Sequence, residues 1–547
     1  MQITIFNLKN PNSLTEQEVI DYSINKFKIN KKNVKSATLV KKSLDLRDKN
    51  NPIYVYQLVL EVSNEEKKNK NLRNKNIEFN TNYTDEIEIE KVSSIDRPII
   101  VGFGPAGLFC AYILALAGLK PIVFERGSEV DKRINDIDEF FNKQIFNPKS
   151  NVCFGEGGAG TFSDGKLNTN LNDPKIRFIL KTFTEFGALE NVYYDSKPHV
   201  GTDKIRLVVK GIREKIKSLG GEFHFDSLVT SVKSNKICVL ENENLSEYES
   251  SKIVLAIGHS AKETYEMLYQ NGFNLEPKPF SMGVRIEHLQ KDINKIQYGE
   301  FSKVSYAAPY KIAVHLANRD VYTFCMCPGG YVVASNSHEN QIVTNGMSYS
   351  ARDGINSNSA LLVNVRVDDY FVNSPLDGLT FQQKYENACF NLTNSYKAPV
   401  NLVKEFLTDE VAKEFRSIKP TYPCGTIFSS FNNLLPPFAI TALKEGIKEI
   451  DKSMPGFLND DAILTAIESR SSSPVRILRD KKYESNIKGI YPIGEGAGYA
   501  GGITSSALDG IKCALSIIES LKEDSYESWF TYAFNSFWWY FFCRKTS

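Results

Sequence analysis

The stretch Ile99-Ile-Val-Gly-Phe-Gly-Pro-Ala-Gly107 decides the fold of this sequence. Three β-branched residues predict a short buried strand, and the spacing Gly102-x-Gly104-x-x-Gly107 predicts a tight turn into a helix that ends near Ala117. Pro121–Glu125 is expected to form the next strand, so residues 97–125 predict a βαβ unit. Glycines at such a turn let the backbone approach a pyrophosphate, whose charge the free N–H groups of the helix would stabilise.

An acidic side chain closes this unit. Glu125 ends the second strand 23 residues after Gly102, where a carboxylate can accept hydrogen bonds from the hydroxyls of a ribose. An acid at this place favours an adenosine ribose without a 2′-phosphate. The alternative interpretation is a tight strand–helix turn that binds nothing.

Length and composition limit the remaining possibilities. The 547 residues exceed the ~250–300 at which single cores stop growing, so two or three domains are expected. With 42% hydrophobic and 24% charged residues, the chain is neither disordered, collagen-like nor coiled-coil. A net charge of +1 provides no overall attraction to nucleic acid or to an acidic membrane. The N-terminus shows no signal peptide and no run of ~20 apolar residues occurs, so we expect a cytoplasmic enzyme.

Cysteine spacing excludes several kinds of site. Nine cysteines occur, with no CxxC or CxxxxC pair and a single CxC, Cys325 and Cys327. This argues against a disulfide scaffold, a zinc ribbon and a disulfide-reductase centre. No clustered histidines and acids suggest a metal site.

Residues 1–96 are expected to form a small separate domain. The order βαββαβ predicts a ferredoxin-like module. Its expected elements are a strand at Ile3–Phe6, a helix with a capping box at Ser13 and Glu16, strands at Ser36–Leu46 and Ile53–Val62, and a final strand near Glu86–Val92.

This region is rich in lysine. Between Lys26 and Lys75 stand 14 basic and 5 acidic residues, an excess of nine positive charges. A solvated surface is one interpretation. A surface for RNA or a protein partner is the other, in which Tyr54 and Tyr56 on one strand face would contribute.

Three further glycine-rich segments follow the βαβ unit. Gly155–Lys166 carries glycines that would let a loop run close to a flat ligand or a phosphate. Ile253–Gly258 is an apolar strand ending on glycine, and a plain core strand is the alternative. At Gly489–Ser506 a strand runs into Gly494-Glu495 and then a helix. The acid could hold the ribityl hydroxyls of a flavin, while the helix N-terminus could face the pyrimidine edge of its ring.

Together these segments resemble two-dinucleotide-binding-domain flavoproteins. Five more motifs make the sequence similar to the bacterial family of uncharacterised FAD-dependent dehydrogenases over about residues 35–518. They are Pro198-His-Val-Gly-Thr-Asp203, Gly283-Val-Arg-Ile-Glu-His288, Cys325-Met-Cys-Pro-Gly-Gly330, Thr344-Asn-Gly-Met-Ser348 and Glu468-Ser-Arg-Ser-Ser-Ser-Pro-Val-Arg476. The resemblance implies a flavoprotein and no particular substrate.

The expected fold is α/β, a Rossmann-like FAD-binding domain with an inserted α+β substrate domain and an N-terminal ferredoxin-like domain. The expected limits are 1–96 for the N-terminal domain, 97–280 and 461–520 for the FAD-binding domain, 281–460 for the substrate domain and 521–547 for an aromatic tail. All three tryptophans lie in that tail, which could be an interfacial anchor, an oligomer contact or an aberrant terminus.

The expected activity is hydride transfer through FAD between NAD(P)H or an organic substrate and an unknown acceptor. The residues expected to bind the cofactor are Gly102, Gly104, Pro105, Ala106, Gly107, Glu125, Arg126, Gly158, Gly160, Ser163, Asp164, Gly165, Lys166, Gly258, Gly494, Glu495, Gly501, Gly502 and Ile503.

Catalytic groups are chosen by chemistry. Hydride transfer needs a proton donor or acceptor beside the substrate, and His199, in a turn-like run, suits that role, with His288 second. Arg470 and Arg476 flank three serines and could bind a carboxylate or phosphate. For each of these residues a structural role is the alternative. A small-molecule substrate is the expected partner. A flavin-containing factor that binds RNA or protein is the competing function.

Overall fold

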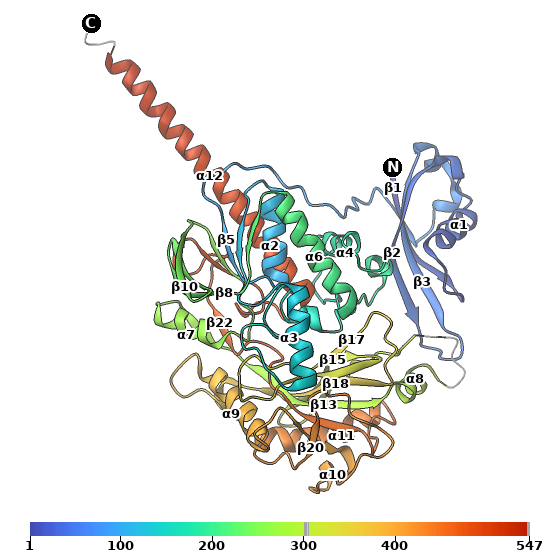
Figure 1. Cartoon of the computed structure of the whole chain (residues 1–547). Helices are drawn as coiled ribbons and strands as arrows, with labels where there is room; N and C mark the ends of the chain where they lie inside the picture. The colour runs from blue at the N-terminus through green and yellow to red at the C-terminus, as the bar shows by residue number, and fades with distance from the viewer. Residues whose placement is uncertain (300–303, 305, 544–547) are drawn as a thin grey trace.

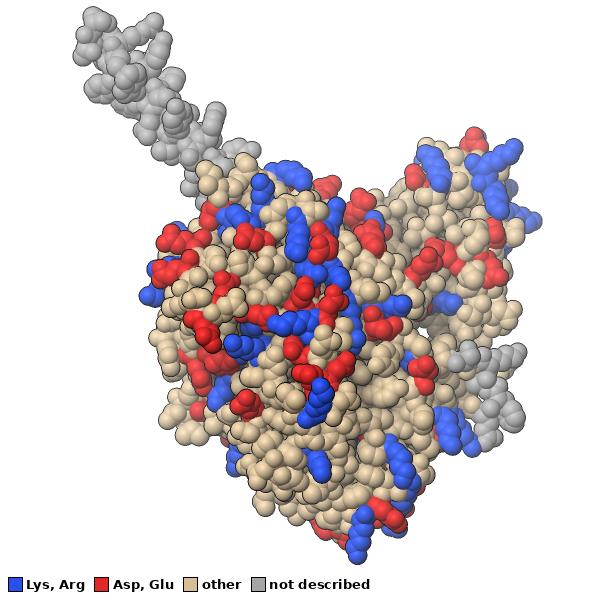
Figure 2. Space-filling view, in the orientation of Figure 1, with Lys and Arg blue, Asp and Glu red and all other residues tan. Residues whose placement is uncertain are grey.

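The computed structural model describes residues 1–299, 304 and 306–543, with side chains described as far as Glu523. The chain forms three parts, each built on its own sheet (Figure 1). An N-terminal antiparallel sheet lies beside a central parallel sheet, and a large, mostly antiparallel sheet lies below the central one in that view. Acidic and basic side chains are intermingled over the face shown in Figure 2.

The N-terminal sheet has the order β2-β3-β1-β4. Its elements are β1 (Gln2–Asn10), α1 (Glu16–Phe27), β2 (Val34–Asp45), β3 (Ile53–Val62), three short 3-10 turns (Lys31–Asn33, Asn64–Lys68 and Lys70–Leu72) and β4 (Ile77–Phe79). That the module is ferredoxin-like stays a prediction. The helix begins two residues later than the expected capping box, because Thr15 is the N-cap and pairs reciprocally with Glu18.

The strand expected near Glu86–Val92 is absent from the described structure. This segment alternates acidic and apolar residues, which mimics a strand. Its apolar members Ile87, Ile89 and Val92 instead pack against the helices of the central part, and the Val92 N–H donates to Ala117 O. The fourth strand of the N-terminal sheet is therefore β4, earlier in the chain.

The central sheet is parallel, in the order β23-β11-β5-β6-β7. Its strands are β5 (Ile99–Val101), β6 (Ile122–Phe124), β7 (Glu222–His224), β11 (Ile253–Leu255) and β23 (Ile490–Pro492). Ile100 and Val254 face α2 (Pro105–Leu116), α6 (Thr202–Ser218) and α12 (Ile503–Cys543). Ile99 and Leu255 face the opposite side, which is covered by the meander β8 (Ser227–Lys233), β9 (Lys236–Glu241) and β10 (Asn244–Glu249). Because successive side chains of these three-residue strands point to opposite sides, both faces of the central sheet are buried.

The predicted βαβ unit at 97–125 is confirmed as β5, α2 and β6. Between β6 and β11 the chain also forms α3 (Val130–Lys143), a 3-10 turn (Ala159–Phe162), α4 (Lys175–Glu185) and α5 (Asn191–Tyr194). After β11 follow α7 (Lys262–Gln270) and β12 (Leu275–Pro277), which pairs with β22 (Val475–Ile477).

The third part is a seven-stranded sheet of order β14-β15-β18-β13-β21-β19-β20. Its strands are β13 (Phe280–Leu289), β14 (Ala313–His315), β15 (Asp320–Cys327), β18 (Asn356–Val365), β19 (Ala398–Leu402), β20 (Thr426–Phe428) and β21 (Ile463–Glu468). A hairpin of β16 (Gly330–Ala334) and β17 (Thr344–Ser348), the helices α8 (Gln290–Tyr298), α9 (Asp377–Asn391), α10 (Val403–Leu407) and α11 (Pro437–Ser453), and a 3-10 turn (Val367–Asp369) accompany it. The chain leaves the central sheet after β11 and returns to it at β23, so distant segments meet at one edge.

Within the described residues no helix combines the length and the apolar character that a membrane crossing requires. The roles expected for the aromatic tail depend on side chains outside the described ones, and they stay predictions.

Candidate functional site

The turn between β5 and α2 has the geometry of an anion site. Gly102 has φ +96°, and a Cβ on Gly107 would lie 2.0 Å from Gly102 O, so both positions require glycine for the turn itself. Gly104 is different. Its φ is −73°, and a Cβ there would meet only Gly158 Cα, at an ordinary 3.7 Å. Because Gly104 is the N-cap and provides no side-chain cap, the first N–H groups of α2 are left for another acceptor.

Glu125 stabilises this turn through hydrogen bonds to backbone N–H groups. The side chain is buried, and its two oxygens accept hydrogen bonds from the N–H groups of Phe103 (2.9 Å), Gly127 (3.0 Å) and Gly155 (3.0 Å). A carboxylate has about four acceptor positions, so about one remains for a ribose hydroxyl. Glu125 therefore has a structural role that its place in the sequence did not reveal.

The glycine-rich loop lies directly against the turn. Gly157 N–H donates to Phe103 O at 2.8 Å, and a Cβ on Gly158 would come within 2.9 Å of Gly104 Cα. Gly160 lies beside Ile503, the first residue of α12, because a Cβ on Gly160 would lie 3.2 Å from the Ile503 Cγ1. The loop thus brings the turn and the start of α12 to one place.

An arginine that the sequence analysis missed fixes this loop. Arg133, on α3, is fully buried and donates to four backbone carbonyls, those of Asn151, Val152, Glu156 and Gly158. Burial lowers the pKa of Arg133 to about 10, so the group stays charged at neutral pH. The amphipathic sequence of α3 does not indicate that Arg133 binds the loop.

The fourth glycine segment meets the third. A Cβ on Gly496 would lie 2.5 Å from Gly258 O, and the Tyr265 hydroxyl donates to Gly496 O at 2.7 Å. Glu495 lies 3.2 Å from Nδ1 of His259, a residue that the sequence analysis did not select. Gly501 and Gly502, just before α12, are exposed, and a Cβ on either would meet no close backbone.

A second group of predicted residues gathers where the glycine-rich loop ends. Asp164 is buried, and Oδ2 lies 2.7 Å from the Arg352 guanidinium and 3.2 Å from the Lys166 ammonium. Burial alone would raise the pKa of Asp164, but these two cations outweigh it and hold that pKa below its ordinary value. Lys166 and His199 are paired through their backbones as an isolated bridge. We call Asp164, Lys166, His199 and Arg352 the charged cluster.

As far as the structure describes the chain, His199 contributes a ring nitrogen without a hydrogen-bond partner to the charged cluster, as Lys166 contributes an ammonium that is ion-paired but makes no hydrogen bond. The buried Nε2 of His199 has no hydrogen-bond partner among the described residues. Burial, and after it the nearby Arg352, lower the pKa of His199 to about 4, so the imidazole is neutral at pH 7. A neutral imidazole can accept a proton and cannot donate one as an imidazolium would.

Comparison with known proteins now identifies the family. Residues 279–471 match the family model described as FAD-dependent protein, C-terminal domain-like. An uncharacterised protein of Clostridium beijerinckii is 45% identical over 512 residues, which cover 90% of this chain and 94% of that protein. The chain belongs to this family of FAD-dependent proteins.

Among solved structures the likenesses are distant. The FrdA subunit of Escherichia coli quinol fumarate reductase is 10% identical, with a TM-score of 0.36, over 78% of this chain and 70% of that one. A flavoprotein/dehydrogenase of Cytophaga hutchinsonii is 13% identical, with a TM-score of 0.35, over 78% and 79%. Neither bears on the activity of this FAD-dependent protein.

The residues present fit FAD. The uncapped α2 N-terminus and the space beside Gly104 suit a pyrophosphate, and Glu125 retains an acceptor for the adenosine ribose. Arg126 follows Glu125 in the chain. Its guanidinium lies 3.8 Å from the centre of the Phe154 ring, and its Nη1 is paired with Glu263 at 2.6 Å. Its buried Nε has no hydrogen-bond partner in the part of the chain that the structure describes. These atoms and spaces have no explanation in the packing of the chain alone.

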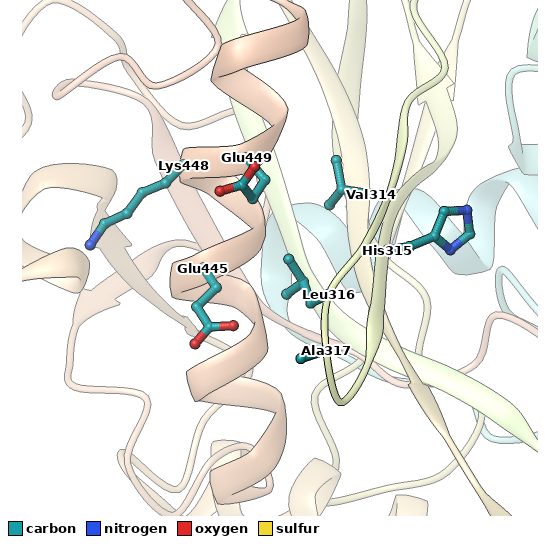
Figure 3. Close-up of a pocket in the computed structure, with 7 residues that line it drawn as sticks. All are labelled: Val314, His315, Leu316, Ala317, Glu445, Lys448 and Glu449. Carbon is teal, nitrogen blue, oxygen red and sulfur yellow. The ribbon is translucent and has the colours of Figure 1, made fainter.

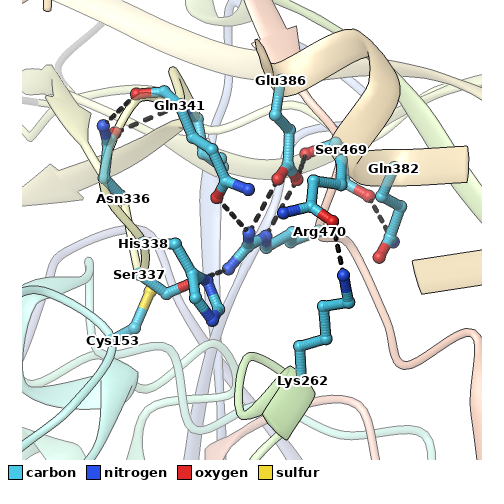
Figure 4. Close-up of polar contacts among 12 residues, drawn as sticks. Cys153, Lys262, Asn336, Ser337, His338, Gln341, Gln382, Glu386, Ser469 and Arg470 are labelled. Carbon is cyan, nitrogen blue, oxygen red and sulfur yellow. Dashed lines mark hydrogen bonds and ion pairs between the residues drawn. The ribbon is translucent and has the colours of Figure 1, made fainter. Parts of the chain in front are cut away.

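Arg470 does not join the charged cluster. Its guanidinium donates to Glu386 through Nε (2.9 Å) and Nη2 (2.7 Å), to Gln341 through Nη2 (3.0 Å), and to the Ser337 hydroxyl (Figure 4). Glu386 is fully buried and also accepts from Ser469. With each of its nitrogens engaged, Arg470 has the geometry of a structural ion pair, and only a cavity of about 20 Å³ lies beside it.

Arg476 and His288 also lie apart from the charged cluster. Arg476 pairs with Glu276 at 2.9 Å and lies over the Tyr499 ring, while its Nε has no hydrogen-bond partner within the described residues. His288 is fully buried and bonds to Phe457 O at 2.8 Å. Burial lowers the pKa of His288 to about 4. This environment favours the structural alternative for His288.

A pocket of about 520 Å³ lies between the β14–β15 hairpin and α11 (Figure 3). It is lined by Val314, His315, Leu316, Ala317, Glu445, Lys448 and Glu449. None of the predicted site residues lines it, and its polar groups come from exposed or half-buried side chains.

Proposed function

We propose that this FAD-dependent protein is an oxidoreductase that passes a hydride through the flavin, between NAD(P)H or an organic substrate and an acceptor. The observation that carries the proposal is the charged cluster, with its unpartnered His199 Nε2, at the end of the loop that packs on the Gly102–Gly107 turn. FAD supplies two-electron chemistry when it is bound.

The chain would hold FAD through four segments. The N-terminus of α2 would bind the pyrophosphate, and Glu125 would accept from the ribose. Glu495 would bind the ribityl hydroxyls, while Gly501, Gly502 and Ile503 at the start of α12 would stabilise negative charge on the pyrimidine edge. Arg133 contributes by keeping the glycine-rich loop rigid.

Protons would be handled by the charged cluster. His199 is neutral at pH 7, so its Nε2 would accept a proton from the substrate as the hydride leaves. Burial alone would lower the pKa of Lys166, but Asp164 outweighs it and raises that pKa. Lys166 therefore stays cationic and would position an anionic or carbonyl oxygen.

The competing RNA-binding function has less support. Tyr56 is almost fully buried, so its ring is not available for stacking on bases, and its neighbour Tyr54 stacks on it. Several charges of the lysine-rich region are paired, as in Lys31–Asp21, Lys35–Glu61 and Arg47–Asp45. We retain as proposals the cytoplasmic location and the domain limits given above.

Anaerobic addition of NADH and NADPH to the purified protein, followed by absorption spectroscopy, tests the proposal. Bleaching of the flavin band by either nucleotide, and its return with an added acceptor, is the expected result. A bound flavin that no nucleotide and no organic donor reduces would instead indicate a structural role.

A further inference from the structure

The single CxC motif lies at an irregularity of the third sheet. Pairing of β15 with β18 shifts register between Phe324 and Cys327, and Cys325 adopts φ +45°, which side-chain-bearing residues rarely take. Cys327 Sγ lies 3.2 Å from Cys325 O, to which Arg285 Nη1 also donates at 3.2 Å. The bulge therefore brings the Cys327 thiol against the backbone of Cys325.

The two cysteines differ in exposure. Cys325 is partly exposed, whereas Cys327 is fully buried. The neighbouring Cys327 side chain, together with Lys166 and Arg285, lowers the pKa of Cys325 against the opposing effects of burial and of Asp164. Burial raises the pKa of Cys327. The pair thus loses its first proton easily and keeps its second.

The charges around this pair come from three elements. Lys166 belongs to the glycine-rich loop, and its buried Nζ is ion-paired with Asp164 but makes no aligned hydrogen bond. Arg285, on β13, is fully buried and neutralised by Glu468 on β21, whose own charge also acts on Cys325. The Lys166 ammonium is therefore the cation with spare capacity to stabilise a thiolate.

We propose that Cys325 and Cys327 form a dithiol site that reduces a small-molecule disulfide. Cys325 is the attacking thiolate and Cys327 the resolving thiol. An easily ionised thiol on a half-buried residue, next to a residue with a buried, protonated thiol, is the arrangement that we propose for such exchange. The usual CxxC and CxxxxC spacings are absent, and this pair is instead a CxC at a strand bulge.

The exchange proceeds in two steps. The Cys325 thiolate attacks one sulfur of the disulfide R–S–S–R, that bond breaks, and one RS⁻ leaves. Cys327 then attacks the Cys325 sulfur, its proton passes to the second RS group, and RSH leaves as the Cys325–Cys327 disulfide closes. The protein dithiol is oxidised by two electrons, and the small disulfide is reduced to two thiols.

The test uses the full-length protein, reduced, desalted and treated with oxidised glutathione. Peptide mapping by mass spectrometry should show a Cys325–Cys327 disulfide in the wild type and a glutathione adduct on Cys325 in Cys327→Ser. Cys325→Ser should show neither. Lys166→Met should slow the reaction by about tenfold at pH 6, because less of Cys325 is thiolate.

Cys153 and Cys238 are the matched controls, since both are partly exposed. The proposal fails if the wild type forms no Cys325–Cys327 disulfide, or if Cys153 or Cys238 reacts as fast as Cys325. Thiol mapping needs no flavin reduction, so its failure leaves the oxidoreductase proposal standing, and failure of nucleotide bleaching leaves the dithiol proposal standing.

Discussion

Replacing Glu125 with alanine should weaken both the fold around the Gly102–Gly107 turn and the retention of FAD. The side chain is buried and accepts from three backbone N–H groups, on Phe103, Gly127 and Gly155. Each buried donor left without its charged acceptor costs about 1–3 kcal/mol. Water can enter the space that the side chain leaves and satisfy part of this demand, so we expect a loss of about 3–5 kcal/mol in the free energy of unfolding.

The assay is denaturant unfolding of flavin-free protein, together with flavin content after gel filtration. Glu66→Ala is the matched control. Glu66 is a buried carboxylate in the N-terminal part that also accepts three hydrogen bonds, from the Asn30 N–H and the side chains of Asn33 and Asn69. It should lower stability and leave flavin content unchanged. A Glu125→Ala protein with wild-type stability and wild-type flavin would refute both roles of this residue.

Three further substitutions test other parts of the site. Gly104→Val should fold normally, because a Cβ fits there at 3.7 Å. It should lose FAD, because the branched side chain blocks the pyrophosphate, and normal flavin content would contradict the anion site. The His199→Asn protein should keep its flavin and melting temperature, and its turnover should be about 10²–10⁴-fold slower, as is typical when a general base is removed. Loss of folding would show that the histidine is structural. Glu386→Ala should destabilise the protein by about 3–5 kcal/mol, because Arg470 is left as an unpaired buried charge; unchanged thermal unfolding would argue against the structural ion pair.

Local sequence signals predicted the central part well. The β5–α2–β6 unit is built from one continuous stretch, residues 99–124, and the glycine spacing restricts the turn between β5 and α2 to one geometry. The strand predicted at 86–92 is wrong, because alternating apolar and acidic residues also occur when one side of an extended segment packs on helices.

Contacts between distant segments could not be predicted. Arg470 meets Glu386 across 84 residues, and Asp164 meets Arg352 across 188. One sequence gives no sign of such pairings, so Arg470 was expected in the site and Arg352 was not. The φ of Cys325 at the β15 bulge is likewise set by tertiary structure.

The central claim is that these glycine segments hold FAD. Denaturing the freshly purified protein and separating the released small molecules by chromatography tests it directly. We expect close to one FAD per chain, with no FMN. Protein that is folded, by circular dichroism and gel filtration, and that neither releases FAD nor takes it up when it is added would contradict the account.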